Sequence, residues 1–330
     1  PGHDFGAWWS YSFQRTGGLS LPDKGAPVPE PVRSSPGNVQ LTTMNDRRDW
    51  TRFAEAYFDP TSGVLMGEPP FWPEVTGPLS YRGHDLVSAD TRHLRGALDA
   101  NGLQDGFITA LAPGSAARIG NKYYANEEEH IWAWADVLRE EYKAIIDAGL
   151  TLQIDDPSLA ESWDQINPEP SVADYRAFIQ TRIDAINHAI KGLPEDKIRF
   201  HLCWGSWHGP HTTDLEFVHI ADKMLEINAG QYSFEAANAR HEHEWKVWKD
   251  VSLPEGKKIL PGVVGHSTNV VEHPDLVAER IVRFADLVGA ENVVASTDCG
   301  LGGRVHPQIA WAKLESLGEG ARRAAQQLNG

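Results

Sequence analysis

The sequence predicts an α/β protein, a (β/α)8 barrel of the TIM type, and two observations support this class. Between residues 107 and 298, short apolar runs alternate with helical periods, as parallel strands alternate with their crossover helices. Barrel enzymes place their sites at the C-terminal ends of many strands, whereas an open sheet gathers them at one switch point. We favour the barrel because polar residues close nearly every predicted strand: Asp155, Asp156, His201, Cys203, Glu235, His266, Asp298 and Cys299.

The predicted elements have local signals in the sequence. Asn126 followed by Glu129 is typical of a capping box at a helix start, and Gly149 is expected to end that helix. Pro274 is expected to begin a later helix that runs to about Gly289. The predicted strands are 107–112, 151–157, 198–204, 231–235, 259–264 and 292–298, and the predicted helices are 126–149, 175–190, 213–228, 274–289 and 307–328.

The N-terminal third differs from this regular part. Eleven of the 21 prolines lie in the first 100 residues, so we expect long loops, one or two short helices and aromatic anchors at Trp8, Trp9, Phe71 and Trp72. The expected organisation is a single domain, in which an irregular Pro-rich segment, 1–106, packs on the barrel units of 107–330. Since six strands fall short of eight, the first βα units are expected to lie before residue 1 or within this segment.

Composition excludes several classes of function. The formal charge of −16 repels phosphate backbones, so a nucleic-acid partner is not expected. No apolar run approaches the 18 residues of a membrane span, and the first residues lack the features of a signal peptide. Two cysteines cannot form a disulfide framework, so a cytoplasmic, reducing location is expected.

One histidine and two cysteines suggest a metal site. His201 and Cys203 lie two positions apart on one predicted strand, so their side chains point to the same face. Glu235 and Cys299 end later strands and would lie on the same barrel rim, which gives a four-coordinate shell typical of zinc. Spacing alone does not decide the matter, because free cysteines in a reducing compartment are often buried packing residues.

Three segments resemble signature segments of the cobalamin-independent methionine synthase family, which includes the epoxyalkane:coenzyme M transferases. They are H-L-C-W-G-S-W-H-G-P-H, S-F-E-A-A-N-A-R-H-E-H-E-W and S-T-D-C-G-L, and the resemblance covers roughly residues 107–320. It implies a (β/α)8 barrel without cobalamin, in which zinc is held by His201, Cys203, Glu235 and Cys299. It also implies two βα units ahead of the stretch G-A-W-W-S-Y-S-F-Q-R-T-G-G, and this sequence does not contain them.

The resemblance implies a zinc-dependent methyl- or alkyltransferase. Zinc would convert a substrate thiol, whose pKa is ordinarily about 8.5, into a thiolate that attacks a methyl or epoxide carbon. Two Cys ligands suit this transfer better than water activation, because hydrolytic zinc sites are usually rich in His. The expected partners are a small-molecule thiol and an alkyl donor, with a folate as the methyl donor of the synthases.

Several alternatives stay open at this point. The same zinc site would serve an epoxyalkane:coenzyme M transferase, a C–S lyase or a non-catalytic zinc-containing subunit. A homo-oligomer, or a second chain that supplies the first barrel strands, is also open.

The resemblance also implies substrate residues. Asp155 and Asp156 match a strand end whose first carboxylate holds the amino group of homocysteine, although a cap before Pro157 is the simpler interpretation. His266 falls where the synthases have a proposed proton donor, and an ordinary loop His is the alternative. The loop histidines His208 and His211 would bind metal or orient the rim. His211 and Asn238 complete the predicted substrate site. The segment H-E-H-E-W at 241–245 is expected to be a solvated helix start.

Overall fold

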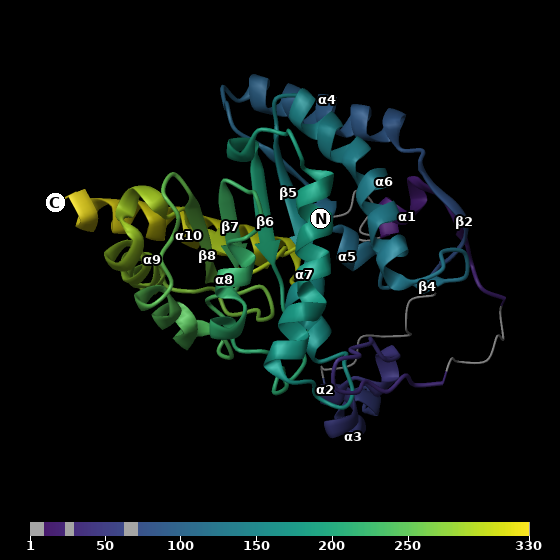
Figure 1. Ribbon diagram of the computed structural model, residues 1–330. Helices are drawn as coiled ribbons and strands as arrows, with labels where there is room; N and C mark the ends of the chain where they lie inside the picture. Colours follow the sequence, from purple (N-terminus) through teal and green to yellow (C-terminus); the bar gives the residue numbers. More distant parts are fainter. Residues whose placement is uncertain (1–9, 24–29, 63–71, 330) are drawn as a thin grey trace.

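A six-stranded parallel sheet forms the centre of the computed structural model, which describes residues 10–23, 30–62 and 72–329. The sheet curls into a half-barrel with helices outside it (Figure 1). Its strands follow each other in space as they do in the sequence. All six predicted strands are present, but the one predicted over 292–298 is only two residues long. They are β3 (Phe107–Leu111), β5 (Thr151–Asp156), β6 (Ile198–Leu202), β7 (Gln231–Phe234), β8 (Lys258–Val264) and β9 (Ser296–Thr297).

The crossover helices largely follow the predicted boundaries. Asn126 caps the first of them, since its side chain accepts a hydrogen bond from Glu129 N at 2.8 Å. The helix predicted over 213–228 is wrong in extent, because only a 3-10 turn at Phe217–His219 and four residues of α8 are helical. The helices are α6 (Glu127–Asp147), α7 (Val172–Ala189), α8 (Ala221–Met224), α9 (Pro274–Val288) and α10 (Pro307–Asn329).

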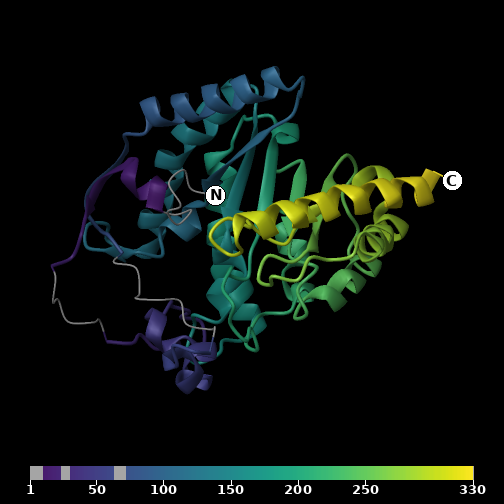
Figure 2. The same ribbon diagram turned by 180° about the vertical axis from the view of Figure 1, so that it is seen from behind.

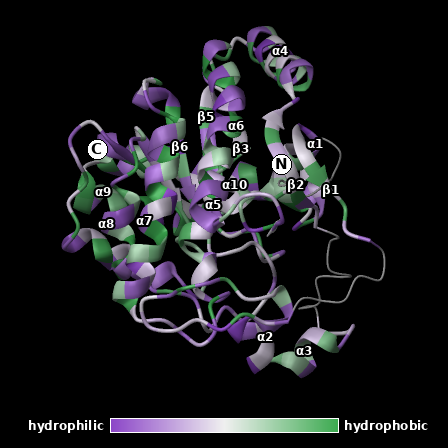
Figure 3. Cartoon of the chain, turned by 45° about the vertical axis from the view of Figure 1, so that its right-hand side comes forward, coloured by the Kyte–Doolittle hydropathy of each residue, from purple (hydrophilic) through white to green (hydrophobic). Residues whose placement is uncertain are grey.

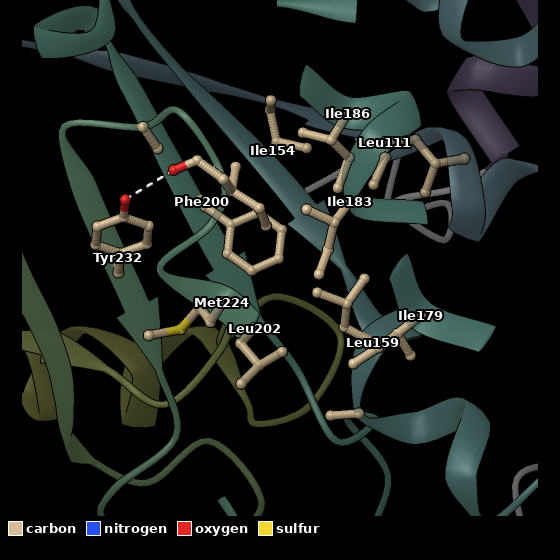
Figure 4. Packing of buried hydrophobic residues seen from close by; sticks show 14 of the residues in the cluster. Leu111, Ile154, Leu159, Ile179, Ile183, Ile186, Phe200, Leu202, Met224 and Tyr232 are labelled. Carbon is tan, nitrogen blue, oxygen red and sulfur yellow. Dashed lines mark hydrogen bonds between the residues drawn. The ribbon is translucent and has the colours of Figure 1, made fainter. Parts of the chain in front are cut away.

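Buried and partly buried side chains alternate along β5. In β5, Leu152 and Ile154 are fully buried, whereas Gln153 between them is only partly buried. Figure 4 shows Ile183 and Ile186 of α7 on the side of the sheet to which Ile154 points. Each such apolar side chain contributes about 1.5–3 kcal/mol through burial, so the helix-facing side of the sheet forms the main core. The opposite side of the sheet is left for polar residues.

A second, smaller hydrophobic cluster is formed by the C-terminal part of the chain. It joins β8, α9 and α10, and α10 extends away from the sheet as a long helix (Figure 2). Its buried members are separate from the main core and are Val263, Val264, Val277, Ala278, Ile281 and Ala324.

The N-terminal region is more regular than its composition predicts. The 17-residue helix α4 (His84–Ala100) buries Val87, Thr91 and Leu98 and is otherwise largely hydrophilic (Figure 3). Trp72 contacts the ring of Phe13 at a centroid distance of 6.2 Å, as expected of an anchor, while Trp8, Trp9 and Phe71 lie outside the described residues. The other elements are α1 (Ser10–Gln14), β1 (Thr16–Ser20), α2 (Arg48–Arg52), α3 (Ala54–Phe58), β2 (Glu74–Tyr81), α5 (Pro113–Ala116) and β4 (Gly120–Asn121).

The closed eight-stranded barrel is not present among the described residues. β1 pairs antiparallel with β2, and β2 pairs with β4, so these strands form a sheet of their own. The described part of residues 1–100 therefore adds no strand to the parallel sheet, whose edge strands are β3 and β9. None of the described helices is both long and apolar enough to cross a bilayer.

Candidate metal centre

The inner face of the half-barrel is built in polar layers. The register places Asp155 beside His201 and His201 beside Ser233, on three neighbouring strands. His201 Nδ1 lies 3.0 Å from Ser233 Oγ, which orients the imidazole. Below this layer, Arg199 donates to Gln231 at 3.1 Å and to Gln153 at 3.3 Å. The strand alternation thus delivers one polar side chain per strand to each layer.

Cys203 and Cys299 meet His201 at the upper end of this face. Their Sγ atoms are 3.9 Å apart, and the ligand atoms of all three residues lie within 4.8 Å of one another. Two thiolates that bind one tetrahedral zinc at about 2.3 Å are separated by about 3.8 Å. The Nε2 atom of His201 is buried and has no hydrogen-bond partner among the described residues. The residues therefore fit a zinc ion.

The ionisation of the three side chains of this trio is linked through Cys299. A hydrogen bond from Cys203 is the main cause that holds the pKa of the Cys299 thiol well below its ordinary value, and the interaction with His201 lowers this pKa further. The reciprocal interaction with Cys299, together with burial, raises the pKa of Cys203 well above its ordinary value. Burial would lower the pKa of His201, but Cys299 more than offsets this and raises it to about 9. One thiolate is thus already favoured, and a thiolate is the form that binds metal.

Glu235 lies beside this trio and belongs to a second group. Its ligand oxygen lies within 4.8 Å of ligand atoms of His266 and Asp298, and all three residues are buried. Glu235 Oε1 accepts from Trp204 N at 3.0 Å, and Oε2 accepts from Asn238 Nδ2 at 2.6 Å. The predicted substrate residue Asn238 therefore contacts the carboxylate of Glu235.

His266 follows β8 and is only 2% exposed. Neither of its ring nitrogens has a hydrogen-bond partner in the described part of the chain. Leaving a buried imidazole unpaired costs free energy, so both nitrogens are available for a ligand or a solvent molecule. A loop histidine that only covered the surface would be exposed.

The two adjacent aspartates point to opposite faces of β5. Asp155 shares the inner face with His201, and burial raises the pKa of its carboxyl group. Asp156 is fully buried on the other side, where Oδ1 accepts from Ser115 Oγ at 2.7 Å and from Ser158 N at 2.8 Å. Asp156 thus caps the 3-10 turn Pro157–Leu159, as the simpler interpretation of D-D-P expects.

Comparisons with known proteins show the family of the chain. Residues 82–323 match the family described as "Cobalamin-independent synthase, Catalytic domain". The chain belongs to this family. It is 28% identical over 211 residues to a methionine synthase of Thermococcus kodakarensis and 26% identical over 258 residues to one of Saccharolobus solfataricus. These alignments cover 63% and 78% of this chain, but 54% and 68% of the two relatives.

A solved structure shares the fold. It is a B12-independent methionine synthase from Shewanella sp. W3-18-1 in complex with selenomethionine, with a TM-score of 0.71 at 19% identity. The superposition covers 97% of this chain and 80% of that chain.

A clamp from the N-terminal region, which we define as residues 42–57, lies outside the family match and holds the rim. Its Arg47 is 1% exposed and donates to Glu161 Oε1 and Asp164 Oδ2, both at 2.7 Å. The Arg47 guanidinium also lies 4.3 Å from the ring centroid of Trp207, in the loop that follows Cys203. Sequence reasoning missed this role because D-R-R-D-W reads as a solvated charge run.

A second residue of the clamp, Asp49, holds the same loop mainly by accepting hydrogen bonds from the loop's backbone amides. Asp49 accepts from Thr212 N at 3.2 Å and Oγ1 at 3.0 Å, and from His211 N at 3.3 Å. Tyr57 OH adds a further hydrogen bond to Asp49 at 3.1 Å. The loop after Cys203 is therefore held in place from the N-terminal region.

Within this loop, the predicted residue His211 takes part in a buried chain of charged side chains. Asp214 Oδ2 lies 2.8 Å from His211 Nδ1 and 3.0 Å from His241 Nε2, and His241 Nδ1 lies 2.7 Å from Glu244 Oε2. The expected solvated helix start at 241–245 is wrong in this respect, because His241 is 3% exposed. Burial would lower the pKa of His241, but the hydrogen bonds to Asp214 and Glu244 raise it to about 10.

Proposed function

We propose that this chain is the catalytic domain of a zinc-dependent methyl- or alkyltransferase that acts on a small thiol. The observation that carries the proposal is the convergence of Cys203, Cys299 and His201 within 4.8 Å on the inner face of the sheet. A zinc ion bound there would lower the pKa of a substrate thiol and make it a nucleophile at neutral pH. Family membership and the methionine synthases among the relatives support the choice of a transferase.

The chain's own residues have distinct parts in this proposal. His201, Cys203 and Cys299 would hold the metal, and Glu235 would be the fourth ligand once its side chain leaves Trp204 N and Asn238. Asp155, on the same face, would hold a cationic group of the thiol substrate. His266 would hold or deliver a proton at the leaving group, and its two ring nitrogens, unpaired within the described residues, support this role.

We further propose that the half-barrel is part of a complete (β/α)8 barrel. The alignment covers 54% of the Thermococcus relative, and the superposition covers 80% of the Shewanella chain, so both proteins have a part without a counterpart in the comparison. Two additional strands between β3 and β9 would close the sheet. A reducing compartment such as the cytoplasm suits the site, because oxidation would join two sulfurs that are 3.9 Å apart.

A two-stage experiment tests the proposed function. Elemental analysis of freshly purified protein should find about one zinc per chain. A panel of thiols, including homocysteine and coenzyme M, is then added while the zinc X-ray absorption edge is recorded. A substrate thiol should add a sulfur to the zinc shell, and methyltetrahydrofolate should then be tested as the donor. If no thiol enters the shell at saturation, the transferase mechanism is wrong.

A further inference from the structure

Asp298 connects the loops that follow β7 and β9, two strands that are separated in the sheet by β8. It follows β9 and is fully buried, yet its Oδ1 accepts hydrogen bonds from Ala236 N and Ala237 N, both at 2.8 Å. Those two amides belong to the loop after β7. Because the sheet order is β7-β8-β9, the carboxylate must pass over β8 to reach them.

A glycine in β8 makes this passage possible. At Gly262, a Cβ atom would lie 2.2 Å from Asp298 Oδ1 and 2.4 Å from Asp298 Cα. Such distances are far inside van der Waals contact, and the second involves the backbone, so no other residue fits without a shift of the chain. The absence of a side chain at Gly262 therefore leaves the space through which the Asp298 side chain crosses β8.

Both ends of this tether adjoin a predicted metal ligand. Glu235 immediately precedes Ala236, and Cys299 immediately follows Asp298. We propose that Asp298 is a positioning residue, which fixes the loop of Glu235 against the loop of Cys299 so that both ligands reach one metal ion. The inference rests on the proposed function, because it requires the metal site.

The tether works through an acceptor atom. One oxygen with two lone pairs satisfies two adjacent amides, and the side-chain carbonyl of Asn offers the same two lone pairs. The other oxygen, Oδ2, is buried and has no partner among the described residues. The substitution Asp298→Asn therefore keeps the tether, whereas Asp298→Ala removes it.

The test compares four variants with the wild type. Asp298→Ala and Gly262→Ala should abolish the tether, Asp298→Asn should keep it, and Gly300→Ala is a matched control beside Cys299 where a Cβ would meet nothing within 4 Å. Zinc affinity is measured by competition with a chromophoric chelator, and Co²⁺ spectra report thiolate ligation and geometry. Asp298→Ala should lower zinc affinity about 10–100-fold and change the Co²⁺ spectrum, while Asp298→Asn and Gly300→Ala stay within about three-fold of the wild type.

A metal-independent measurement accompanies the titrations. In Asp298→Ala, the amides of Ala236 and Ala237 lose their acceptor, so their hydrogen exchange should accelerate in a protein whose circular dichroism is unchanged. If Asp298→Ala binds zinc as tightly as the wild type, or if Asp298→Asn is as weak as Asp298→Ala, the inference is overturned. If the wild type itself binds neither Zn²⁺ nor Co²⁺, the proposed function fails first, and the exchange data still show whether the tether exists.

Discussion

The Sγ atoms of Cys203 and Cys299 lie 3.9 Å apart although the residues are 96 positions apart in the sequence. Cys203 follows β6 and Cys299 follows β9, which is three places along the sheet. In a flat sheet, strands three places apart are separated by about 14 Å, since neighbours are spaced by about 4.8 Å. The curl of the half-barrel therefore brings the two sulfurs together, and the candidate metal centre depends on that curvature.

The first prediction concerns metal content. Cys299→Ser should lose most of the zinc, because zinc prefers a thiolate to a hydroxyl group. Elemental analysis after desalting measures this, and His208→Ala is the control, since the exposed His208 is not part of the converging trio. Equal zinc in wild type and Cys299→Ser would show that Cys299 is not a zinc ligand.

The second prediction separates the two aspartates of β5. Asp155→Asn should weaken thiol binding by about 1.5–3 kcal/mol, the contribution of a hydrogen bond to a charged group, with unchanged zinc content. Asp156→Ala should instead lower the free energy of unfolding by about 1 kcal/mol through loss of the cap, with unchanged thiol affinity.

Thiol affinity by calorimetry and urea unfolding measure the two effects. If Asp155→Asn binds a thiol as well as the wild type does, the substrate does not present an ammonium group to Asp155. A thiol such as coenzyme M then becomes the better candidate.

The third prediction concerns the clamp. Arg47→Met leaves the buried carboxylates of Glu161 and Asp164 short of a partner, so the free energy of unfolding should fall by about 3–5 kcal/mol. Arg33→Met removes an ion pair with Asp46 whose arginine is 54% exposed, and should cost at most about 1 kcal/mol. Urea denaturation of both variants measures these changes. Similar losses of unfolding free energy in the two variants would mean that the buried ion pairs of Arg47 contribute no more to stability than the exposed pair of Arg33.

The fourth prediction is a pH dependence. The folded-state pKa of His241 is about 10, above an unfolded value of about 6.5, because Asp214 and Glu244 face the imidazole and outweigh its burial. His211 is linked to the same chain through Asp214. The stabilisation is therefore complete below about pH 6.5 and is lost as the pH rises through about 10. His241→Gln should flatten the fall in unfolding free energy over this window, and parallel curves for the two proteins would refute the assignment.

Sequence patterns predicted the central strands because each combines an apolar run with a nearby turn signal. The same patterns predicted where His201, Cys203 and Cys299 lie, since the C-terminal ends of parallel strands share one rim. Alternation along a strand also predicts that Asp155 and Asp156 point to opposite faces. Which of them shares a face with His201 depends on the register of the neighbouring strands.

Other features depend on contacts that no local pattern encodes. Arg47 contacts Glu161 across 114 residues, and its charge is buried only because the clamp folds back on the rim. His241 is in a charged stretch, H-E-H-E-W, whose composition predicts exposure; its burial follows from Asp214, 27 residues earlier. Asp298 is recognisable only once the sheet order shows which strand it crosses.

Because β8, α9 and α10 share a separate hydrophobic cluster, we expect the C-terminal part of the chain to open locally as a unit. Segments with their own small core open as units at a lower free energy than the whole domain. Such an opening would carry Cys299 and Asp298 away while Cys203 stays on the folded sheet. Metal and local unfolding would then compete directly, and by mass action a bound ion would slow amide exchange throughout α9 and α10, far from the ion itself.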